Sequence, residues 1–461
     1  APPKDTEYEF LVDPSYAELK EYLSRPGILA FDTETTGLNT RLDKVIGMSF
    51  SNSYTSAAAI LLHDCDDRLQ LVKEVLENVD IKKATQNGSF DCAILHSSLS
   101  IDVGGMQYDT RLAEQLMNSD MPTSLDHLRA VYTKIKPYKP TKSEMKTIAH
   151  WGKERMLQYA NWDAVCTYQV MIEQKKVMTP GQLHLLETLL IPLVPALNSM
   201  SLKGVLIDIN QLAGMYAANI PKLKALEEDI QQRIGINPHS PKQVKEHFQL
   251  DSSDRKTLEY YIERGDSRGP DMELVLSCRD LKKESGTYLK GLFDRLEENY
   301  IHTSYLPDGT GTGRLSSRDP NLQNIPKPIR RLYIAEEGHY LVSGDYKQLE
   351  LWVGSVIAPC SALNTALKNG IDVHSLIAAE MKPFVPERLH HKIRIIAKTV
   401  VFGTFYGRGA RSIAIEYGCS VQQAEEWQRI CFSNYPGLVK YVKDRYNDYE
   451  STKVVTTPWG R

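Results

Sequence analysis

Four acidic residues in three short segments have the spacing needed to hold divalent cations. The first segment, residues 31–38, reads Phe-Asp-Thr-Glu-Thr-Thr-Gly-Leu and contains Asp32 and Glu34. Side chains alternate between the two faces of a β-strand, so these carboxylates point to the same side. Two carboxylates on one face repel each other unless a cation lies between them. Solvated acids in a turn at the end of a strand are the alternative for this segment taken alone.

The other two segments add one carboxylate each. Residues 86–95 place Asp91 early in a predicted helix that follows an Asn-Gly turn, and residues 159–168 contain Tyr159 and Asp163. Tyr159 and Asp163 are four residues apart, so they are neighbours on one helix face. Oxygen ligands favour hard cations such as Mg²⁺ or Mn²⁺.

A turn-rich segment in the second half of the chain has side chains suited to nucleic acid. Residues 311–326 read Gly-Thr-Gly-Arg-Leu-Ser-Ser-Arg-Asp-Pro-Asn-Leu-Gln-Asn-Ile-Pro. An arginine and amides on a rigid turn can reach phosphates and minor-groove acceptors without demanding one base sequence. A plain turn-rich loop is the alternative interpretation.

A predicted helix near residue 400 carries a stripe of two cations and two aromatic rings. Arg394, Lys398, Phe402 and Tyr406 step by four, so they share one broad face. The combination suits a triphosphate tail and a stacked base, and two glycines in the same stretch let a base pair approach closely. The alternative is an ordinary amphipathic helix with a basic stripe. However, two valines and two glycines give this stretch a poor helix propensity, which favours a functional reason.

The elements that position the acidic residues follow an α/β pattern. Strands are predicted at residues 28–32, 45–50 and 57–62, helices at 67–78 and 111–117, and a loop at 134–147. Leucines at helical spacing begin near residue 183, and the rest of the chain is mainly helical. Helices are predicted at 211–234 and 271–298, a loop at 305–328, a strand at 339–352, and further helices to the end.

Composition and charge narrow the class of protein. The chain has 42% hydrophobic and 25% charged residues, which is ordinary for globular proteins. No apolar run approaches the roughly 18–20 residues that span a bilayer, so no membrane partner is expected. Residues 1–178 hold 20 Lys and Arg against 25 Asp and Glu, a net charge of −5, whereas residues 327–461 hold 18 against 13, or +5. The basic C-terminal region either binds along the phosphate backbone of a nucleic acid or is a solvated surface.

The termini and cysteines indicate the compartment. The N-terminus lacks both an initiator Met and a signal-peptide pattern, which predicts a processed or trimmed start. Seven widely spaced cysteines form no Cys-x-x-Cys pair. This spacing argues against a disulfide framework and against a zinc site, and it predicts a reducing, intracellular location.

The three acidic segments resemble, in order and spacing, the motifs of DnaQ-like 3′→5′ proofreading exonucleases. The family pattern is Asp-x-Glu, then Asn-x-x-x-Asp, then Tyr-x-x-x-Asp, and every one of these positions matches. The resemblance implies a ribonuclease H-like mixed sheet with helices, and two divalent cations about 3.5–4 Å apart that activate water and stabilise the leaving 3′ oxygen. It assigns metal binding to Asp32, Glu34, Asp91 and Asp163, and orientation of the attacking water to Tyr159.

The later segments resemble family A DNA polymerases, the bacterial DNA polymerase I family. Residues 311–326 match the segment that joins thumb to palm, and residues 394–407 match the fingers helix Arg-x-x-x-Lys-x-x-x-Phe-Gly-x-x-Tyr-Gly. Residues 344–352 resemble the first palm motif, although Lys347 and Trp352 replace the usual Ser and Arg. Neither departure falls on an expected metal ligand.

The resemblance implies a role for each matched position. Asp345 would bind a catalytic metal ion, and Glu350 would be the steric gate that excludes a ribose 2′-hydroxyl. Lys398 would bind phosphate and protonate the departing pyrophosphate. The other nucleotide contacts would be Gln348, His374, Arg394, Phe402 and Tyr406, and the DNA contacts would be Arg314, Asn321, Gln323 and Asn324.

A second palm carboxylate, which two-metal phosphoryl transfer needs, is missing from the expected place. The family supplies it from a Val-His-Asp-Glu hairpin beyond the fingers, whereas this sequence stops at Arg461. The pair His63-Asp64 is interpreted as a turn at the end of a strand. Two explanations stay open: a natural split with a second polypeptide that completes the palm, which is preferred, or a shortened chain.

The sequence therefore predicts an α/β exonuclease domain over residues 1–178 and a mainly α, α+β partial polymerase right hand over 179–461. Within the latter we expect a thumb at about 187–300, part of a palm at about 301–360 and fingers at about 361–461. The predicted function is a proofreading DNA polymerase that uses a primer-template, deoxynucleoside triphosphates, Mg²⁺ or Mn²⁺ and a second polypeptide. The expected location is the cytoplasm, a host cytoplasm if the protein is viral, or an organelle. A stand-alone exonuclease whose polymerase part clamps DNA and a non-catalytic accessory subunit are the alternatives.

Overall fold

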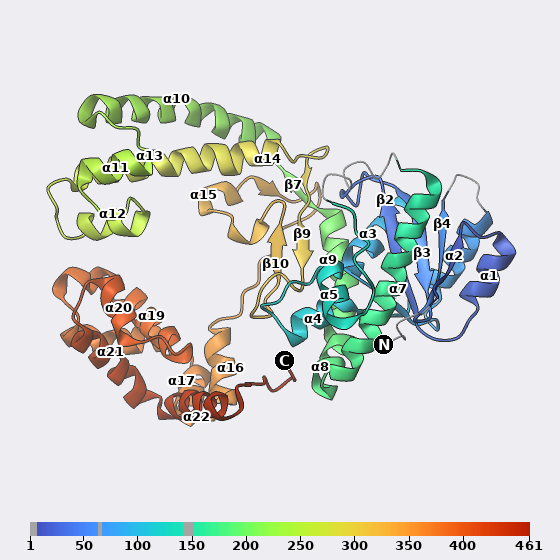
Figure 1. The fold of residues 1–461 in the computed structure, drawn as a ribbon. Helices are drawn as coiled ribbons and strands as arrows, with labels where there is room; N and C mark the ends of the chain where they lie inside the picture. Colours follow the sequence, from blue (N-terminus) through green and yellow to red (C-terminus); the bar gives the residue numbers. More distant parts are fainter. Residues whose placement is uncertain (1–6, 63–66, 142–150) are drawn as a thin grey trace. The chain divides into compact units, whose positions relative to one another are not determined.

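The structure is a computed structural model that describes residues 7–62, 67–141 and 151–461 (Figure 1). The pair His63-Asp64 and the end of the predicted loop, residues 142–147, lie outside the described residues. The chain divides into two compact units. Unit 1 comprises Ala1–Leu226, Arg279–His339 and Thr457–Arg461, and unit 2 comprises Glu227–Cys278 and Tyr340–Thr456.

Unit 1 contains a mixed six-stranded sheet in the order β1-β4-β3-β2-β5-β6. Its strands are β1 (Glu9–Val12), β2 (Leu29–Thr35), β3 (Val45–Ser51), β4 (Ser56–Leu61), β5 (Lys83–Thr85) and β6 (Met106–Asp109). Strand β2 pairs antiparallel with β3 and parallel with β5. The predicted mixed sheet and its three predicted strands are therefore confirmed.

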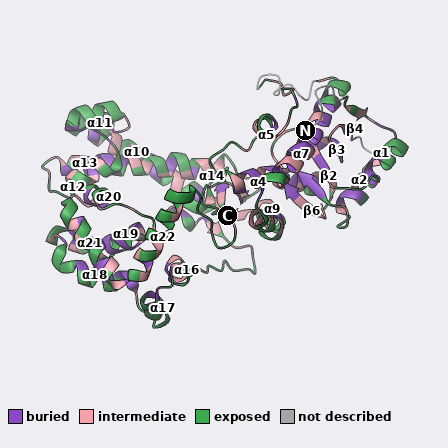
Figure 2. Ribbon diagram, turned by 60° about the horizontal axis from the view of Figure 1, so that its bottom comes forward, coloured by how far each residue is buried: buried purple, intermediate pink, exposed green. Residues whose placement is uncertain are grey.

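Helices cover both faces of this sheet. One face carries α1 (Tyr16–Leu23), α2 (Asp67–Glu77) and α3 (Gly88–Leu99), and the other carries α4 (Thr110–Met117), α5 (Leu125–Tyr132) and α7 (Lys153–Val177). Leu29 and Phe31 of β2 join the core beneath α1 and α2, whereas Ala30 joins the core that includes α7. The alternation of β2 therefore continues Asp32 and Glu34 onto the α7 face. Figure 2 shows the central strands β2 and β3 as mostly buried.

The sheet is lined with small residues where α7 crosses it. Ala57 and Ala59 of β4 pack against residues of α7. Gly47 lies opposite Glu34 in the β2–β3 pair, and a Cβ on Gly47 would lie 3.0 Å from the carbonyl oxygen of Ile60. Helix α7 can therefore lie close to the sheet, with room left for the Glu34 side chain.

A continuous helical stretch follows the six-stranded sheet and its helices. It comprises α8 (Pro180–Leu185), the π-helical turn η2 (Leu186–Leu190) and α9 (Ile191–Lys203). By length and composition alone, Pro180–Lys203 is apolar enough to cross a membrane, although polar residues such as Glu187 and Asn198 interrupt its apolar run. Its residues Leu186, Ile191 and Val194 are buried in a core shared with α4 and α7, as in a packed helix of a globular fold.

Two small sheets complete unit 1. The first has the order β11-β7-β8, from β7 (Val205–Ile207), β8 (Tyr300–Ile301) and β11 (Tyr333–Ile334). In the second, β9 (Ser304–Leu306) pairs antiparallel with β10 (Ser316–Arg318). A hairpin thus forms inside the predicted loop at 305–328, and the 3₁₀ turn η4 (Leu322–Asn324) and α15 (Lys327–Arg330) follow it.

Two long helices each begin in one unit and end in the other. They are α10 (Ile209–Ile234) and α13 (Gly269–Lys283), the latter continued by the π-helical η3 (Glu284–Lys290) and by α14 (Gly291–Phe293). Between them come α11 (Pro241–Phe248) and α12 (Arg255–Ile262). The helices predicted at 211–234 and 271–298 are confirmed, although the second ends at Phe293.

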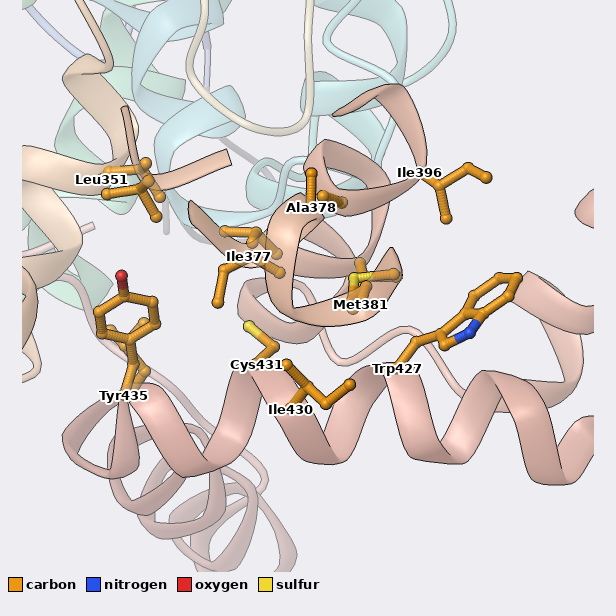
Figure 3. Packing of buried hydrophobic residues seen from close by; sticks show 14 of the residues in the cluster. Leu351, Ile377, Ala378, Met381, Ile396, Trp427, Ile430, Cys431 and Tyr435 are labelled. Carbon is orange, nitrogen blue, oxygen red and sulfur yellow. The ribbon is translucent and has the colours of Figure 1, made fainter. Parts of the chain in front are cut away.

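Helices α16 to α22 form the larger part of unit 2. They are α16 (Leu349–Ile357), α17 (Ser361–Lys368), α18 (Val373–Met381), α19 (Ile393–Phe405), α20 (Ala410–Tyr417), α21 (Val421–Asn434) and α22 (Pro436–Thr452). Figure 3 shows their core, in which Met381 of α18, Ile396 of α19 and Trp427 of α21 are buried together. The indole Nε1–H of Trp427 donates to the carbonyl of Phe384 at 3.0 Å, so this side chain also satisfies a backbone group.

The strand predicted at 339–352 does not form. Residues 341–346 have no regular structure, and α16 begins at Leu349. Tyr340, Leu341 and Val342 are 90%, 62% and 93% exposed. The segment has the composition of a strand, but a strand is stabilised by its neighbours, and no strand among the described residues pairs with this one.

Candidate active sites

A carboxylate cluster lies where β2 meets α7 in unit 1. Oxygen atoms of Asp32, Glu34 and Asp163 lie within 4.8 Å of one another. Glu34 and Asp163 are buried and Asp32 is half-buried. The fold thus joins the strand pair predicted from Asp-x-Glu with the helix carboxylate predicted from Tyr-x-x-x-Asp.

Asp91 approaches from α3 and is held separately. Asn87, at the start of this helix, has a φ of 68°, and Asp91 follows in the first turn, as predicted. The hydroxyl of Thr33 donates to Asp91 Oδ1 at 2.6 Å. Asp91 does not belong to the group of three whose oxygen atoms lie within 4.8 Å of one another. The charge of Asp91 nevertheless helps to raise the pKa of Asp32.

Loss of solvent and the charge of neighbouring carboxylates make Asp32, Glu34 and Asp91 hard to ionise. Both effects, with desolvation the larger, raise the pKa of Asp32 well above its usual range and that of Glu34 to about 8. Desolvation raises the pKa of Asp91 to about 7. Glu34 Oε1 is also buried without a hydrogen-bond partner among the described residues. Several acidic oxygens that need positive charge form a donor set that fits divalent metal ions.

Two residues outside the predicted motifs contact the cluster. Lys139 Nζ donates to Asp163 Oδ2 at 3.0 Å and to the Tyr159 hydroxyl at 3.3 Å. The hydroxyl of Tyr138 donates to Asp163 Oδ1. Both residues fall in the loop predicted at 134–147, and no role is predicted for them because they belong to none of the matched motifs. In the sequence they are visible as a Tyr-Lys pair whose lysine lies 20 residues before Tyr159. This spacing indicates a contact with the cluster only when the fold is known.

The turn that begins α3 is fixed by Asp109. Its carboxylate accepts hydrogen bonds from the backbone N–H of Gly88 at 2.7 Å and of Asn87 at 3.2 Å. The same carboxylate caps α4 through the N–H groups of Arg111 at 2.8 Å and Leu112 at 3.2 Å. Asp109 thereby sets the position of the turn from which Asp91 extends.

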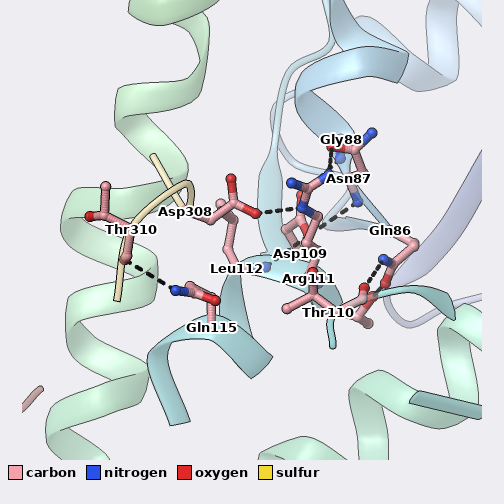
Figure 4. Close-up of polar contacts among 11 residues, drawn as sticks. Gln86, Asn87, Gly88, Asp109, Thr110, Arg111, Leu112, Gln115, Asp308 and Thr310 are labelled. Carbon is pink, nitrogen blue, oxygen red and sulfur yellow. Dashed lines mark hydrogen bonds and ion pairs between the residues drawn. The ribbon is translucent and has the colours of Figure 1, made fainter. Parts of the chain in front are cut away.

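The same turn is tied to the loop before the predicted DNA-contact segment (Figure 4). Arg111 Nη1 donates to Asn87 Oδ1 at 2.9 Å, and its Nε donates to the carboxylate of Asp308. One helical turn along, Gln115 Nε2 donates to the carbonyl of Thr310 at 3.2 Å. The turn that precedes Asp91 and the β9–β10 hairpin are therefore linked by side-chain contacts within unit 1.

The predicted DNA contacts Arg314, Asn321, Gln323 and Asn324 are all exposed on this hairpin and the turn after it. Asn321 Oδ1 accepts from the N–H of Gln323 at 3.0 Å and from the Ser317 hydroxyl at 3.1 Å. Gln323 Nε2 donates to the carbonyl of Leu315 at 3.2 Å. The amides thus hold the turn in a defined shape.

Predicted nucleotide-binding residues gather on α19 in unit 2. Lys398, Phe402 and Tyr406 line a groove with a volume of about 370 Å³. The Lys398 ammonium lies 5.7 Å from the centre of the Phe402 ring, and the His374 ring lies 5.3 Å from it. Helix α19 ends at Phe405, so Tyr406 lies one residue beyond it, where its N–H still donates to the Phe402 carbonyl at 3.0 Å.

Two of the predicted residues are held by other side chains. The Tyr406 hydroxyl donates to Glu350 Oε2 at 3.0 Å. Arg394 does not line the groove but turns to Asp372, with 2.7 Å between Nη2 and Oδ2. Against the effect of partial burial, hydrogen bonds from Arg394 and Ser375 lower the pKa of Asp372 to about 2.

The remaining predicted residues of unit 2 differ in exposure. Asp345 is exposed in the segment before α16, and Gln348 begins that helix with a φ of 56°. His374 is buried, and desolvation lowers its pKa, so its imidazole is neutral near pH 7. Among the described residues, no group of three converging ligands includes Asp345.

Two family models match the chain. The one described as DNA polymerase family A matches residues 201–461, and the one described as 3′-5′ exonuclease matches residues 14–178. A DNA polymerase I of Pseudomonas aeruginosa is 29% identical over 502 residues, covering 99% of this chain and 54% of the relative. A DNA polymerase I of Treponema pallidum is 27% identical over 524 residues, covering 98% and 52%. The chain thus spans about half the length of the curated relatives it matches.

A solved structure has a similar fold. It is described as the POL domain of Pol1 from M. smegmatis in complex with DNA primer-template and dNTP, and its TM-score with this chain is 0.81. The two are 21% identical, and the match covers 98% of this chain and 81% of that one. The predicted fold class, an α/β exonuclease domain followed by a mainly helical polymerase part, is confirmed.

Proposed function

This chain belongs to DNA polymerase family A and carries a 3′-5′ exonuclease domain, and from that membership we propose that it acts in a proofreading DNA polymerase. The observation that carries the proposal is the convergence of Asp32, Glu34 and Asp163 in the exonuclease domain. Its proposed substrates are a DNA primer-template and deoxynucleoside triphosphates, the molecules named for the similar solved structure.

In the exonuclease reaction, we assign metal binding to Asp32, Glu34, Asp91 and Asp163. Mg²⁺ or Mn²⁺, when bound, supplies the positive charge that activates water and stabilises the leaving 3′ oxygen. Tyr159 keeps its proton, because desolvation and the neighbouring carboxylates raise its pKa, and its hydroxyl orients the attacking water. Lys139 adds a positive charge beside Asp163 that offsets part of the repulsion within the cluster.

The double variant Asp32→Ala/Glu34→Ala tests this assignment. We expect it to lose the Mg²⁺-dependent removal of 3′ nucleotides, because both strand carboxylates are gone. Substitution of exposed Glu21 and Asp80 by alanine serves as a control that removes the same formal charge. Unchanged degradation by the Asp32/Glu34 variant would show that the metal ions are held elsewhere.

For the polymerase reaction, we propose that Asp345 binds a catalytic metal ion and that Arg394 and Lys398 bind the triphosphate. Lys398 also protonates the departing pyrophosphate. Gln348, His374, Phe402 and Tyr406 would contact the nucleotide, the last two by stacking near the base pair. Arg314, Asn321, Gln323 and Asn324 would contact primer and template on the exposed hairpin.

We propose that Glu350 is the steric gate against ribonucleotides. Its carboxylate is held in place by the Tyr406 hydroxyl, which gives the gate a fixed orientation. The variant Glu350→Ala should incorporate ribonucleotides more readily, and Tyr406→Phe should do so to a smaller extent. A deoxy/ribo preference that is unaltered in Glu350→Ala would remove the gate role.

We propose that a second polypeptide completes the palm. The exposed apolar residues Tyr340, Leu341 and Val342 support this, because a partner strand would cover them and pair with their backbone. Primer extension with and without a candidate partner chain tests the proposal. If extension never appears with the partner present, a stand-alone exonuclease whose polymerase part clamps DNA is favoured. The location we propose is the cell interior, where DNA and nucleotides occur.

A further inference from the structure

A second cluster of metal-ligating side chains lies in unit 2, outside the proposed active sites. Glu227 belongs to α10, His239 lies in the loop between α10 and α11, and Cys278 belongs to α13. Ligand atoms of all three lie within 4.8 Å of one another. Together with the Asp32 cluster, this makes two such groups in the part of the chain that the structure describes.

A single ring nitrogen faces both of the other ligands. His239 Nε2 lies 2.8 Å from Glu227 Oε1 and 3.7 Å from Cys278 Sγ. A histidine that links two side chains by hydrogen bonds normally uses one nitrogen for each, because each ring nitrogen has one lone pair or one proton. Convergence of a carboxylate oxygen and a sulfur on the same nitrogen is instead the arrangement of ligands around a common ion.

The separations are close to those of tetrahedral zinc. Bonds of about 2.0–2.1 Å to nitrogen and oxygen and about 2.3 Å to sulfur place neighbouring ligand atoms about 3.3–3.6 Å apart. The distances of 2.8 Å and 3.7 Å lie on either side of this range, so small side-chain rotations suffice to admit an ion.

The ligand types also favour zinc over the metals of the proposed active sites. Imidazole and thiolate select Zn²⁺, whereas Mg²⁺ prefers oxygen ligands alone. Cys278 is buried, while His239 and Glu227 are half-buried, so an ion would be sheltered and still reachable by a water molecule as fourth ligand. The three ligands come from two helices and the loop beside them.

We propose that Glu227, His239 and Cys278 bind a Zn²⁺ ion that fastens the loop after α10 to α10 and α13. The thiol of Cys278 loses its proton to solvent when the Zn–S bond forms, so binding tightens as the pH rises. The missing Cys-x-x-Cys pairs argued against zinc only for ligands that are close in sequence. Here His239 is 12 residues from Glu227 and 39 from Cys278, and the fold brings them together.

Titration of the metal-free full chain with Co²⁺ tests the proposal. Thiolate bound to Co²⁺ gives an intense near-ultraviolet charge-transfer absorption that oxygen ligands do not give, so the Asp32 cluster contributes none. We expect one equivalent of Co²⁺ to produce this absorption and Zn²⁺ to remove it by displacement. Cys278→Ser and His239→Asn should abolish it. Cys419→Ser and His247→Asn, the same changes at less buried positions of unit 2, should leave it intact.

Proteolysis in the loop supplies a second measurement that does not depend on the thiolate spectrum. At a Zn²⁺ concentration ten times the Kd, the opened population falls about tenfold, so cleavage within residues 235–240 should slow by that factor. The effect should be absent in His239→Asn. An absorption that persists in Cys278→Ser, or its absence in the unaltered chain, would overturn the proposal and leave a hydrogen-bonded Cys-His-Glu group.

Discussion

Among the residues of the carboxylate cluster, Lys139 has the clearest separate test. Its ammonium lies 3.0 Å from Asp163 and is mostly shielded from solvent. We expect Lys139→Met to destabilise the metal-free protein by about 2 kcal/mol, because a charged hydrogen bond to a buried carboxylate is lost. The same variant should bind Mg²⁺ more tightly, since the cluster gains net negative charge. Denaturant unfolding in EDTA and a Mg²⁺ titration measure the two effects.

The control for this variant is Lys136→Met, which removes an exposed lysine from the same segment. Exposed substitutions of this kind change stability by no more than about 0.5 kcal/mol. Equal behaviour of the two variants would show that Lys139 has no particular link to the cluster.

The cluster also sets a direction for the pH dependence of stability. Glu34 and Asp91 have folded-state pKa values of about 8 and about 7, above their ordinary values of 4.5 and 3.8. At pH values between the ordinary and the folded-state pKa of each group, the folded protein binds more protons than the unfolded chain. The free energy of unfolding therefore falls as the pH rises. Without metal, the exonuclease unit should therefore be less stable at pH 8 than at pH 5.

Denaturant unfolding at several pH values, with EDTA and with Mg²⁺, measures this trend. Mg²⁺ should reduce the loss at pH 8, because it takes over the charge compensation that protons provide at pH 5. The variant Asp32→Asn/Glu34→Gln should flatten the EDTA profile. A metal-free stability that rises from pH 5 to pH 8 would contradict the raised pKa values.

Single residues also mark the limit of what the sequence predicts. Strand periodicity predicted that Asp32 and Glu34 share a face, and the resemblance to the exonuclease motifs implied that Asp163 joins them. The fold does bring these three together. Lys139 and Thr33 were not predictable, because their contacts depend on how a loop and a neighbouring helix pack over the sheet. Periodicity describes one element at a time and cannot supply such contacts.

At the scale of elements, the approach of α7 to the sheet positions Asp163. Ala59 of β4 packs on Leu157 and Ala160 of α7. We expect Ala59→Leu to destabilise unit 1 by about 1–3 kcal/mol, because overpacking displaces the helix. It should also slow the exonuclease, since Asp163 and Tyr159 move with α7 away from β2. Exonuclease rates and denaturant unfolding check both outcomes.

The matched variant is Gln158→Leu, which places a leucine on an exposed position of the same helix. It should leave the exonuclease rate near that of the unaltered chain. If Ala59→Leu were equally harmless, the small residues under α7 would not be what sets the distance between helix and sheet.

Elements also differ in how well the sequence predicts them. The helices at 67–78 and 211–234 were confirmed because an apolar stripe of helical period carries its own packing face. The prediction of a strand at 339–352 was wrong, because a strand depends on hydrogen bonds with another strand. No strand among the described residues supplies them. Helix signals are local, and strand signals are not.

At the scale of the whole molecule, two units with separate cores should unfold separately. Trp427 is fully buried in the core of unit 2. Trp427→Ala should destabilise that unit by about 3–5 kcal/mol, because a large buried side chain leaves a cavity. Calorimetry should then show the transition of unit 2 at a lower temperature and the transition of unit 1, which contains the exonuclease site, unchanged. The rate of 3′ nucleotide removal by this variant should also be preserved.

A single cooperative transition that shifts as a whole in Trp427→Ala would contradict this independence. The result would mean that α10 and α13, which each belong to both units, transmit stability between them.

The uncovered stretch from Tyr340 to Val342 bears on how this protein behaves at high concentration. Extended backbone flanked by large apolar side chains is a template for cross-β contacts, and an identical stretch on a neighbouring molecule is the most abundant complement in a pure sample. Light scattering should therefore rise steeply with protein concentration. A ligand that caps this stretch, whether a natural companion or a short synthetic strand, would act as a solubiliser.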